Sequence, residues 1–468
     1  MRCGHAARGE AGEATGHRVV YRPIPWVASC VLLMWAVTAA ATPPAARYTL
    51  GNGARLVVSE QHALPMIAIE MFIDAGSRRD PQGQEGVAAL TADLLTEGTK
   101  TRTAEEISRA FDALGAAYNI AADVDYAHVS MKLLSKDLDA GLDLLFDVVL
   151  HPRFAEAEVT RRREATLARM KAEEDEPAEV AEHAFLKAIF DDGPYGHPVI
   201  GYPLAVRKLT RTEVTAFYSQ YYRADGAIVT VVGDVAADDI RGRMEKALQG
   251  WKQGTAAEFQ YPAERPAAGA TLTIDKPITQ ANIVLGHIGI ARDNPDYYAV
   301  QVMNFILGGG GFSSRLLDNI RTKAGLAYSV ASFFTSNQAP GSFQVVMQTK
   351  NASTADAIER ACTEIEGMRR DLVSDAAVND ARLYLTGSFP LKLDSTTKLA
   401  SFLTQVEFFN LGDDYTDTFK QRINAVTKED VQRVARKYLQ PDRLTLVVVS
   451  DLAHVRVPPG PVCSSAKR

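Results

Sequence analysis

The chain has 468 residues, of which 46% are hydrophobic and 23% are charged. This is ordinary globular composition, with enough material for more than one hydrophobic core. The formal net charge of -6 is mild and the sequence contains no basic tract, so length and charge argue against a nucleic-acid-binding protein.

The first 45 residues predict an export signal instead of part of a globular domain. Arg18 and Arg22 precede the apolar run VASCVLLMWAV, and an Ala-x-Ala exit follows at Ala39–Ala41, so cleavage is expected near Ala41. The alternative is an uncleaved membrane anchor, because the charge-free stretch IPWVASCVLLMWAVTAAA is just long enough to span a bilayer. In both cases the body faces an extracytoplasmic space, for which we expect a periplasm.

The cysteines predict neither a metal site nor a disulfide framework. Two lie in the leader, and the other two are far apart without metal-binding spacing: Cys3, Cys30, Cys362 and Cys463. We therefore expect the folded body to be held together by its hydrophobic cores.

Strands and long helices alternate along the body. Residues 55–60 (RLVVSE) and 66–76 (MIAIEMFIDAG) predict strands, because they are rich in apolar and β-branched side chains. Residues 104–118 (AEEISRAFDALGAAY) and 136–150 (KDLDAGLDLLFDVVL) predict helices. Gly86–Thr99 (GVAALTADLLTEGT) also predicts a helix closed by a glycine, and this segment contains no histidine.

An internal repeat divides the body into two similar halves. Leu209–Val235 aligns without a gap with Val426–Leu452, at an offset of 217 residues. Each copy has a threonine N-cap with an acidic residue three positions later, then a helix, a tyrosine-rich turn and a β-branched strand. We expect an α+β fold in which helices pack on one face of a mostly antiparallel sheet in each half. The predicted boundaries are 1–45 for the leader, 46–250 and 268–455 for the halves, 251–267 for a linker rich in Ala, Pro and Gly, and 456–468 for a tail.

Six segments in this order resemble the pitrilysin/insulinase family of zinc metallopeptidases, which includes mitochondrial processing peptidase. They are YTLGNGARLVV, DAGSRRDPQGQEGVAAL…LTEGT, DGPYGHPVIGYPLAVRKLT, YYRADGAIVTVVGD, GGGGFSSRLLDNIRTKAGLAYSV and AVTKEDVQRVARKYLQPDRL. The resemblance implies that the two halves form a clamshell. It also implies a zinc site built from an inverted His-x-x-Glu-His motif on a helix of the first half and a distant glutamate.

The positions that would carry this zinc site are occupied by other residues. The motif aligns Ala89 with the first His, Ala92 with the Glu and Asp93 with the second His, and the distant Glu falls near Ala168 and Arg169. Alanine cannot bind metal, and an arginine would repel a dication. We therefore expect no metal in this chain and zinc on a partner subunit. The alternative, a metal site built from Asp93 and Glu97, gains no support from His128, His151, His183 or His197, which have no partner at ligand spacing.

The second half keeps a second part of the family pattern. The segment DNIRTKAGLAYSV contains Arg321 and Tyr328, seven residues apart. By resemblance, such a pair contacts the substrate backbone and polarises the scissile carbonyl from the far half, because both side chains are hydrogen-bond donors. The alternative is that Arg321 is a surface charge and Tyr328 a core aromatic.

A glycine run precedes this pair. It lacks the Lys-Ser/Thr of a phosphate-binding P-loop, so we expect a flexible, close-packed turn that admits the backbone of a substrate or partner. The resemblance implies substrate binding at Gly308, Gly309, Gly310, Gly311 and Phe312.

The chain lacks the zinc-binding residues of the first half but keeps the Arg/Tyr pair of the second half. This combination predicts a non-catalytic subunit. In several relatives activity belongs to a heterodimer, and this chain would supply Arg321 and Tyr328 to a homologous partner that carries His-x-x-Glu-His and zinc. The substrate would be an unfolded peptide bound as an added edge strand. Two alternatives stay open, a structural scaffold or binding protein without a role in proteolysis and an autonomous hydrolase with other ligands.

Overall fold

The computed structural model describes residues 44–191, 193–254, 259–261, 269–458 and 462–463. The predicted export signal, with its membrane-anchor alternative, lies outside the described residues except for its last two positions, and most of the predicted linker lies outside them as well. Among the described helices, none combines the length and apolar character that crossing a membrane requires.

The first half is built on a six-stranded, mostly antiparallel sheet. Its strand order is β1-β2-β6-β3-β5-β4, and only β2 and β6 pair in parallel. In chain order the strands are β1 (Ala46–Thr49), β2 (Arg55–Glu60), β3 (Met66–Ile73), β4 (Ala117–Ala122), β5 (Ala127–Leu134) and β6 (Ala227–Gly233). The helices of this half are α1 (Val87–Leu94), α2 (Ala104–Ala113), α3 (Leu138–Leu150), α4 (Glu156–Glu173), α5 (Pro177–Phe190), α6 (Pro203–Val206), α7 (Arg211–Tyr221) and α8 (Ala237–Ala247).

The second half repeats this plan with five strands. Its order is β7-β11-β8-β10-β9, and only β7 and β11 pair in parallel. The strands are β7 (Thr271–Asp275), β8 (Gln280–Ile288), β9 (Ala327–Ser336), β10 (Pro340–Lys350) and β11 (Thr445–Ser450). The helices are α9 (Tyr297–Asn304), α10 (Thr354–Arg370), α11 (Asp375–Gly387), α12 (Thr396–Phe408), α13 (Tyr415–Ala425) and α14 (Lys428–Tyr438), with π-helical turns at Phe305–Gly309 and Leu317–Thr322.

The internal repeat predicted from the sequence is visible in both halves. Thr210 and Thr427 cap α7 and α14, and each accepts a hydrogen bond within a complete capping box. The strand that follows, β6 or β11, is an interior strand that pairs parallel on one side and antiparallel on the other. The predicted α+β class with mostly antiparallel sheets is therefore confirmed. One predicted helix was too long, since α2 ends at Ala113 and β4 begins four residues later.

The prediction that helices cover one face of each sheet was incomplete, because each half lends one helix to the other. On β3, alternate side chains such as Ile69 and Met71 enter the core of the first half, whereas Ala68 on the opposite face joins the core of the second half. Helix α12 packs on that face, and Thr404 donates a buried hydrogen bond to Thr230 Oγ1 at 2.7 Å.

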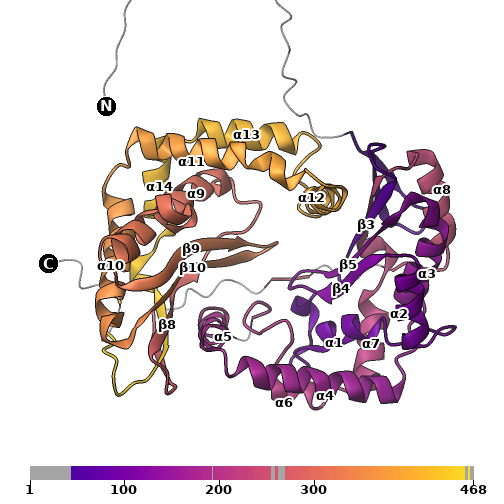
Figure 1. The fold of residues 1–468 in the computed structure, drawn as a ribbon, viewed down its shortest axis with the longest axis horizontal. Coiled ribbons are helices and arrows are strands. Elements are labelled where there is room, and N and C mark those ends of the chain that lie inside the picture. Colours follow the sequence, from indigo (N-terminus) through magenta and orange to yellow (C-terminus); the bar gives the residue numbers. More distant parts are fainter. Residues whose placement is uncertain (1–43, 192, 255–258, 262–268, 459–461, 464–468) are drawn as a thin grey trace, which may run out of the picture. The chain divides into compact units, whose positions relative to one another are not determined.

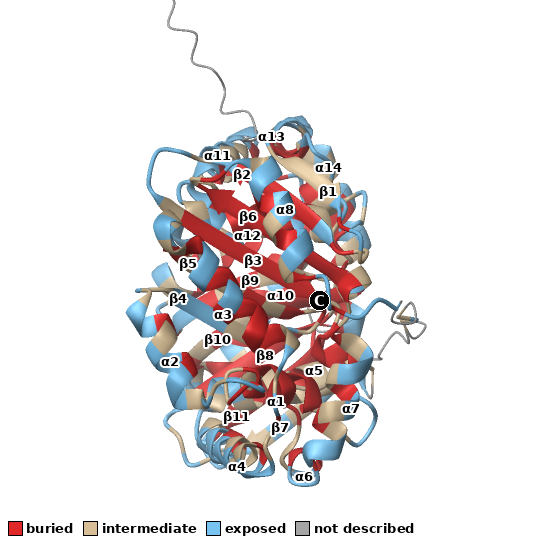
Figure 2. Ribbon diagram, turned by 90° about the vertical axis from the view of Figure 1, so that its right-hand side faces the viewer, coloured by how far each residue is buried: buried red, intermediate tan, exposed pale blue. Residues whose placement is uncertain are grey.

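Helix α5 of the first half makes the reciprocal contact with the second sheet. Its buried face packs Phe185 and Ile189 against Val284, Val447 and Val449 of β8 and β11. Figure 1 shows α12 beside β3 and α5 beside β8, and Figure 2 shows that β3, β6 and β8 are buried along most of their length. Both sheets therefore have two covered faces.

The expectation of a body without disulfides was wrong. Cys362 of α10 and Cys463 of the C-terminal tail are bonded, with their Cα atoms 5.2 Å apart and a sequence separation of 101 residues. The sequence could not predict this pair, because the two cysteines are far apart along the chain. They meet only when the tail, which follows the last strand of the fold, packs against α10. The disulfide thus fastens the tail, which has no regular structure between Ser450 and Cys463 among its described residues.

Cys463→Ser is expected to lower the free energy of unfolding by about 2–5 kcal/mol, because the bond closes a long loop in the unfolded chain. Urea denaturation of the oxidised protein and the variant measures this difference. Dithiothreitol should destabilise the wild type to the same extent and leave the variant unchanged. A wild-type transition that does not respond to the reductant would contradict the prediction.

A buried histidine on β8 makes the fold sensitive to acid. His287 Nε2 accepts a hydrogen bond from the backbone N–H of Gln440 at 3.1 Å, and Nδ1 lies 2.8 Å from the carbonyl oxygen of Ile288. Burial lowers the pKa of His287 to about 4 from its ordinary 6.5. Its protonation would place two N–H donors against each other, so the folded state disfavours the charged form.

Since the folded pKa is depressed, stability should be complete above pH 6.5 and fall as the pH drops from 6.5 to about 4. The total loss from this group is roughly 3 kcal/mol. Chemical denaturation at several pH values measures the slope, and His287→Gln should flatten it in this window. An identical slope in the variant would show that other groups cause the acid sensitivity.

Candidate functional site

Helix α1 carries the positions of the family's zinc motif, and its entry is rigidly built. Gly86 precedes it with φ of 102°, and a Cβ at this position would lie 2.4 Å from the carbonyl oxygen of Ile200. The buried Asp80 carboxylate accepts hydrogen bonds from the N–H groups of Gly86 (2.6 Å) and Ala88 (2.9 Å). Burial holds the pKa of Asp80 well above its ordinary value, although these hydrogen bonds lower it. The start of α1 is therefore fixed independently of any metal.

The structure brings the predicted motif positions to one place. Ala89 is 9% exposed, Ala92 is fully buried and Asp93 is half-buried on α1, which packs against α4. Burial raises the pKa of Asp93, whereas the charges of Arg162 and Arg169 on α4 act in the opposite direction. The charge of Arg169 therefore acts on Asp93 from α4, in the segment where the alignment places the distant glutamate.

Two arginines of α4 pair with Glu97, the second carboxylate of the alternative metal site. Glu97 accepts hydrogen bonds from Arg161 and from Arg162 Nε (2.8 Å), so its oxygens are engaged by two guanidinium groups. Within the part of the chain that the structure describes, no group of three or more His, Cys, Asp or Glu side chains has an arrangement that could hold a metal ion. Two alanines, one carboxylate and one arginine do not fit zinc, which requires three protein ligands at an open catalytic site.

The second candidate site is a surface cluster of Phe312, Arg321 and Tyr328, which we call the aromatic clamp. Arg321 lies in the π-helical turn Leu317–Thr322, and Tyr328 is near the start of β9. The Arg321 guanidinium carbon lies 5.4 Å from the ring centroid of Phe312 and 5.9 Å from that of Tyr328. Phe312 is 78% and Tyr328 is 72% exposed, so the interpretation of Tyr328 as a core aromatic is wrong.

The guanidinium of the aromatic clamp has unused donors. The Arg321 side chain makes no hydrogen bond or ion pair with any other described residue, whereas Arg315 and Lys323 nearby pair with Glu364 and Asp318. π-Helical turns are rare and frequently occur at functional sites. The arrangement therefore presents a cation with free N–H groups between two aromatic faces. No hydrogen bond, ion pair or ring contact among the described residues joins this cluster to α1.

The glycine run is close-packed, but at most positions it is not open. A Cβ on Gly308 would lie 2.5 Å from Ser332 N, one on Gly309 2.9 Å from Asn304 Nδ2, and one on Gly310 2.7 Å from the carbonyl oxygen of Phe305. Gly311 alone has free space around it, and its φ of +55° favours glycine. Close backbone packing therefore explains three of these glycines, so the expectation of a flexible turn is corrected.

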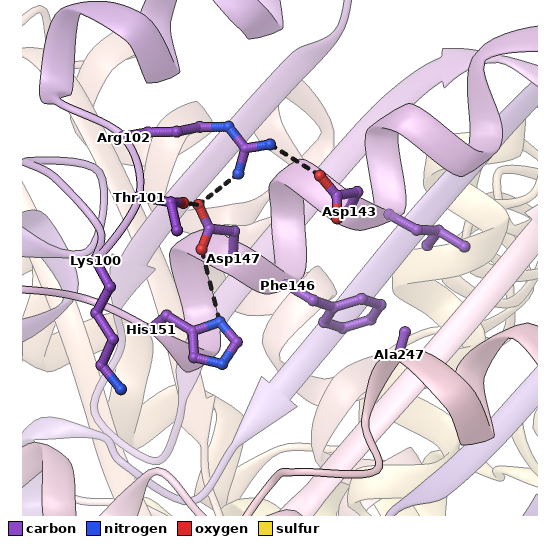
Figure 3. A pocket seen from close by; sticks show the side chains of 9 residues that line it. Lys100, Thr101, Arg102, Asp143, Phe146, Asp147, His151 and Ala247 are labelled. Atoms are coloured by element: carbon purple, nitrogen blue, oxygen red, sulfur yellow. Dashed lines mark hydrogen bonds and ion pairs between the residues drawn. The ribbon is translucent and has the colours of Figure 1, made fainter.

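A cavity of about 590 Å³ on the first half was not predicted from the sequence (Figure 3). It lies between the loop after α1 and helices α3 and α8, with lining residues Lys100, Thr101, Arg102, Leu142, Asp143, Phe146, Asp147, His151 and Ala247. Asp147 accepts hydrogen bonds from Thr99 Oγ1 (2.8 Å), Thr101 Oγ1 (3.0 Å) and Arg102 Nη1 (2.6 Å). Most polar groups of the cavity are thus satisfied within the chain, which makes it a structural network. The partners are 45 to 48 residues apart along the chain, so the network could not be recognised from the sequence.

Asp147→Ala should destabilise the fold by about 1–3 kcal/mol, because Thr99 and Arg102 lose their buried acceptor. Burial raises the pKa of Asp147, but hydrogen bonds from Thr99, Arg102 and Thr101 outweigh it and lower the pKa overall. The stabilisation is therefore present above pH 3.8 and lost in stronger acid. Urea denaturation measures both effects. Asp143→Ala is the control, since this carboxylate is mostly exposed and should change stability by less than about 0.5 kcal/mol. Equal effects of the two variants would contradict the network.

Comparisons with known proteins agree with this architecture. Residues 55–202 match the family described as insulinase (peptidase family M16), and residues 208–385 match the peptidase M16 inactive domain. A protein of Mycobacterium leprae named as an uncharacterized zinc protease is 30% identical over 402 residues, which cover 84% of this chain and 89% of that protein. A Bacillus subtilis protein with the same description is 27% identical, covering 85% of this chain and 96% of the relative.

Solved structures show the same fold. The crystal structure of a peptidase M16 inactive domain from Pseudomonas fluorescens superposes with a TM-score of 0.83 at 27% identity, covering 88% of this chain and all of the other. A Helicobacter pylori protease structure superposes with a TM-score of 0.80 at 22% identity. The resemblance of the six sequence segments and the duplicated fold is therefore confirmed, and the chain belongs to the insulinase family of peptidases, family M16.

Proposed function

We propose that this chain is a non-catalytic subunit of a heteromeric M16 peptidase. It would bind unfolded peptides and supply Arg321 and Tyr328 to the active site of a homologous partner that carries His-x-x-Glu-His and zinc. The observation that carries the proposal is the contrast between the two halves. The metal helix holds two alanines and lies in the field of arginines on α4, whereas the half-buried Arg321 side chain has no hydrogen-bond acceptor among the described residues.

The chemistry of the free donors supports a role toward a peptide carbonyl. A guanidinium and a phenol that are already in place stabilise the negative charge that develops on the oxygen during attack. Tyr328 is exposed and Arg321 is half-buried, so a substrate held mainly by another subunit can reach them. This chain's own contribution would be to orient the substrate backbone and to stabilise charge, since it has no residue set for activating water through a metal.

Strand β4 supports peptide binding by strand addition. It is the edge strand of the first sheet and pairs with β5 alone among the described strands. Its first residues, Ala117 to Asn119, are exposed, and α1 contacts the strand. An extended peptide could therefore use the free N–H and C=O groups of β4, with little demand on its side chains.

The disulfide supports the proposed extracytoplasmic location. Cys362 and Cys463 are both buried and bonded, and such bonds form and persist in oxidising compartments. Together with the N-terminal sequence, this favours a periplasmic subunit, soluble if the leader is removed and membrane-tethered if it is retained.

The test is a peptidase assay with metal analysis. The chain is assayed alone and then mixed with a His-x-x-Glu-His homologue from the same cell, using an unstructured quenched fluorescent peptide. The proposal expects turnover only in the mixture and zinc only on the partner. Turnover and zinc in this chain alone would reveal an autonomous hydrolase. If the two chains form a stable complex but the partner's activity is the same with and without this chain, this chain is a scaffold. Either of these two results would overturn the proposal.

A further inference from the structure

Phe312 is an unusual residue to find so exposed. A large aromatic side chain that is 78% exposed gains little from burial, and its Arg321 contact is its only ring or cation contact among the described residues. The two rings of the aromatic clamp are contributed by different segments, one before the π-helical turn and one after it. The guanidinium that they flank has no hydrogen-bonding partner within the described chain.

The turn that carries Phe312 is held in place by its neighbours. Ser314 Oγ donates to the carbonyl oxygen of Gly311 at 2.7 Å, and the Ser313 N–H donates to that of Gly310 at 3.2 Å. On the other side of Phe312, the backbone of Gly308 fits against Ser332 of β9 with no room for a side chain. The backbone of the turn that carries Phe312 is therefore held on both sides of this residue, which gives the glycine run a structural task.

We propose that Phe312 is a positioning residue for Arg321. Its ring would hold the guanidinium by a cation–π contact with Tyr328 at the other side, so that the free N–H groups face outward toward the peptide carbonyl. An arginine held in this way loses less conformational freedom when a substrate oxygen arrives. This inference rests on the proposed function of Arg321 and replaces direct substrate binding by Phe312 with an indirect role.

The geometry distinguishes this role from direct contact with the substrate. A ring that holds Arg321 matters only while Arg321 is present, and it acts on the transition state more than on binding. A ring that touches the peptide would contribute to KM and would still matter in a chain without Arg321. The π face is the relevant property, so an aromatic replacement should suffice and an aliphatic one should not.

The activity test is a double-mutant cycle in the assembled complex. Phe312→Leu is expected to lower kcat about tenfold with KM within about twofold, and Phe312→Tyr should recover most of kcat. In an Arg321→Ala background, Phe312→Leu should add less than a twofold loss, because coupled residues are non-additive. An equal loss in both backgrounds, or a change confined to KM, would overturn the positioning role. If Arg321→Ala itself has no effect, the proposed function fails instead.

A spectroscopic test uses the full-length chain alone and does not depend on activity. Phe312→Trp places an indole beside the guanidinium, and its emission is obtained as the difference from the wild-type spectrum. Replacing Arg321 with Met in this variant should shift the emission and increase acrylamide quenching, because the stacked cation is lost. Circular dichroism confirms that both variants are folded. Identical emission and quenching with and without Arg321 would show that the two side chains do not touch, and this would overturn the inference.

Discussion

Replacing Arg321 with alanine is expected to lower kcat/KM of the assembled enzyme by about 10²- to 10³-fold, the range found when one preorganised oxyanion donor is removed. The reason is that no other nearby cation could donate hydrogen bonds to the substrate carbonyl in place of Arg321. The guanidinium has no other hydrogen-bonding partner among the described residues, and the nearby cations Arg315 and Lys323 are committed to carboxylates. The measurement is the steady-state rate of the complex with a quenched peptide, at matched subunit concentrations.

The matched control is Arg360→Ala, which removes an exposed arginine of α10 without an ion pair among the described residues and should leave the rate unchanged. Tyr328→Phe removes only a hydroxyl and should have a smaller effect of the same kind. Size-exclusion chromatography establishes that the subunits still assemble. A complex that forms normally and works at the wild-type rate without Arg321 would leave only a scaffold role for this chain.

The sequence predicted the fold well where local patterns determine structure. Capping boxes at Thr210 and Thr427, and the β-branched strands that follow them, are short-range features, and both copies form as expected. The α5 and α12 exchange could not be predicted, because nothing in an amphipathic helix states which sheet it will cover. Likewise, the bond between Cys362 and Cys463 depends on where the tail comes to lie.

For the candidate site too, features that depend on local spacing were predicted, whereas contacts between distant segments were not. The alignment correctly placed Ala89 and Asp93 on one face of α1, because residues four apart share a helical face. It also assigned the distant glutamate to the segment around Ala168 and Arg169, and the charge of Arg169 acts on Asp93. The contact between Phe312 and Arg321 was not foreseen, since a cation–π pair across a turn has no sequence signature. The Asp147 network was missed for the same reason.

Rebuilding the metal ligands should make this chain bind zinc, and the removal of Arg169 should decide the outcome. The triple variant Ala89→His/Asp93→His/Arg169→Glu supplies two imidazoles on one helical face and a carboxylate from α4, the open three-ligand site of a catalytic zinc. It is expected to bind about one zinc per chain, measured by elemental analysis after gel filtration. The wild type is expected to retain none under the same conditions.

The double variant Ala89→His/Asp93→His, which keeps Arg169, is the informative control. At the effective dielectric of a protein surface, a guanidinium about 4 Å from the metal repels each unit of the metal's charge by roughly 4 kcal/mol. The zinc affinity of the double variant should therefore be at least about 10³-fold weaker than that of the triple variant. Equal zinc binding by the double and triple variants would show that Arg169 does not face the metal position. Binding by neither, in variants whose circular dichroism matches the wild type, would show that α1 and α4 no longer hold the ligand spacing. If only the triple variant binds zinc, Arg169 on α4 prevents zinc binding even when the histidines of α1 are restored. The same result would show that α1 and α4 still hold their side chains at the spacing of a zinc site.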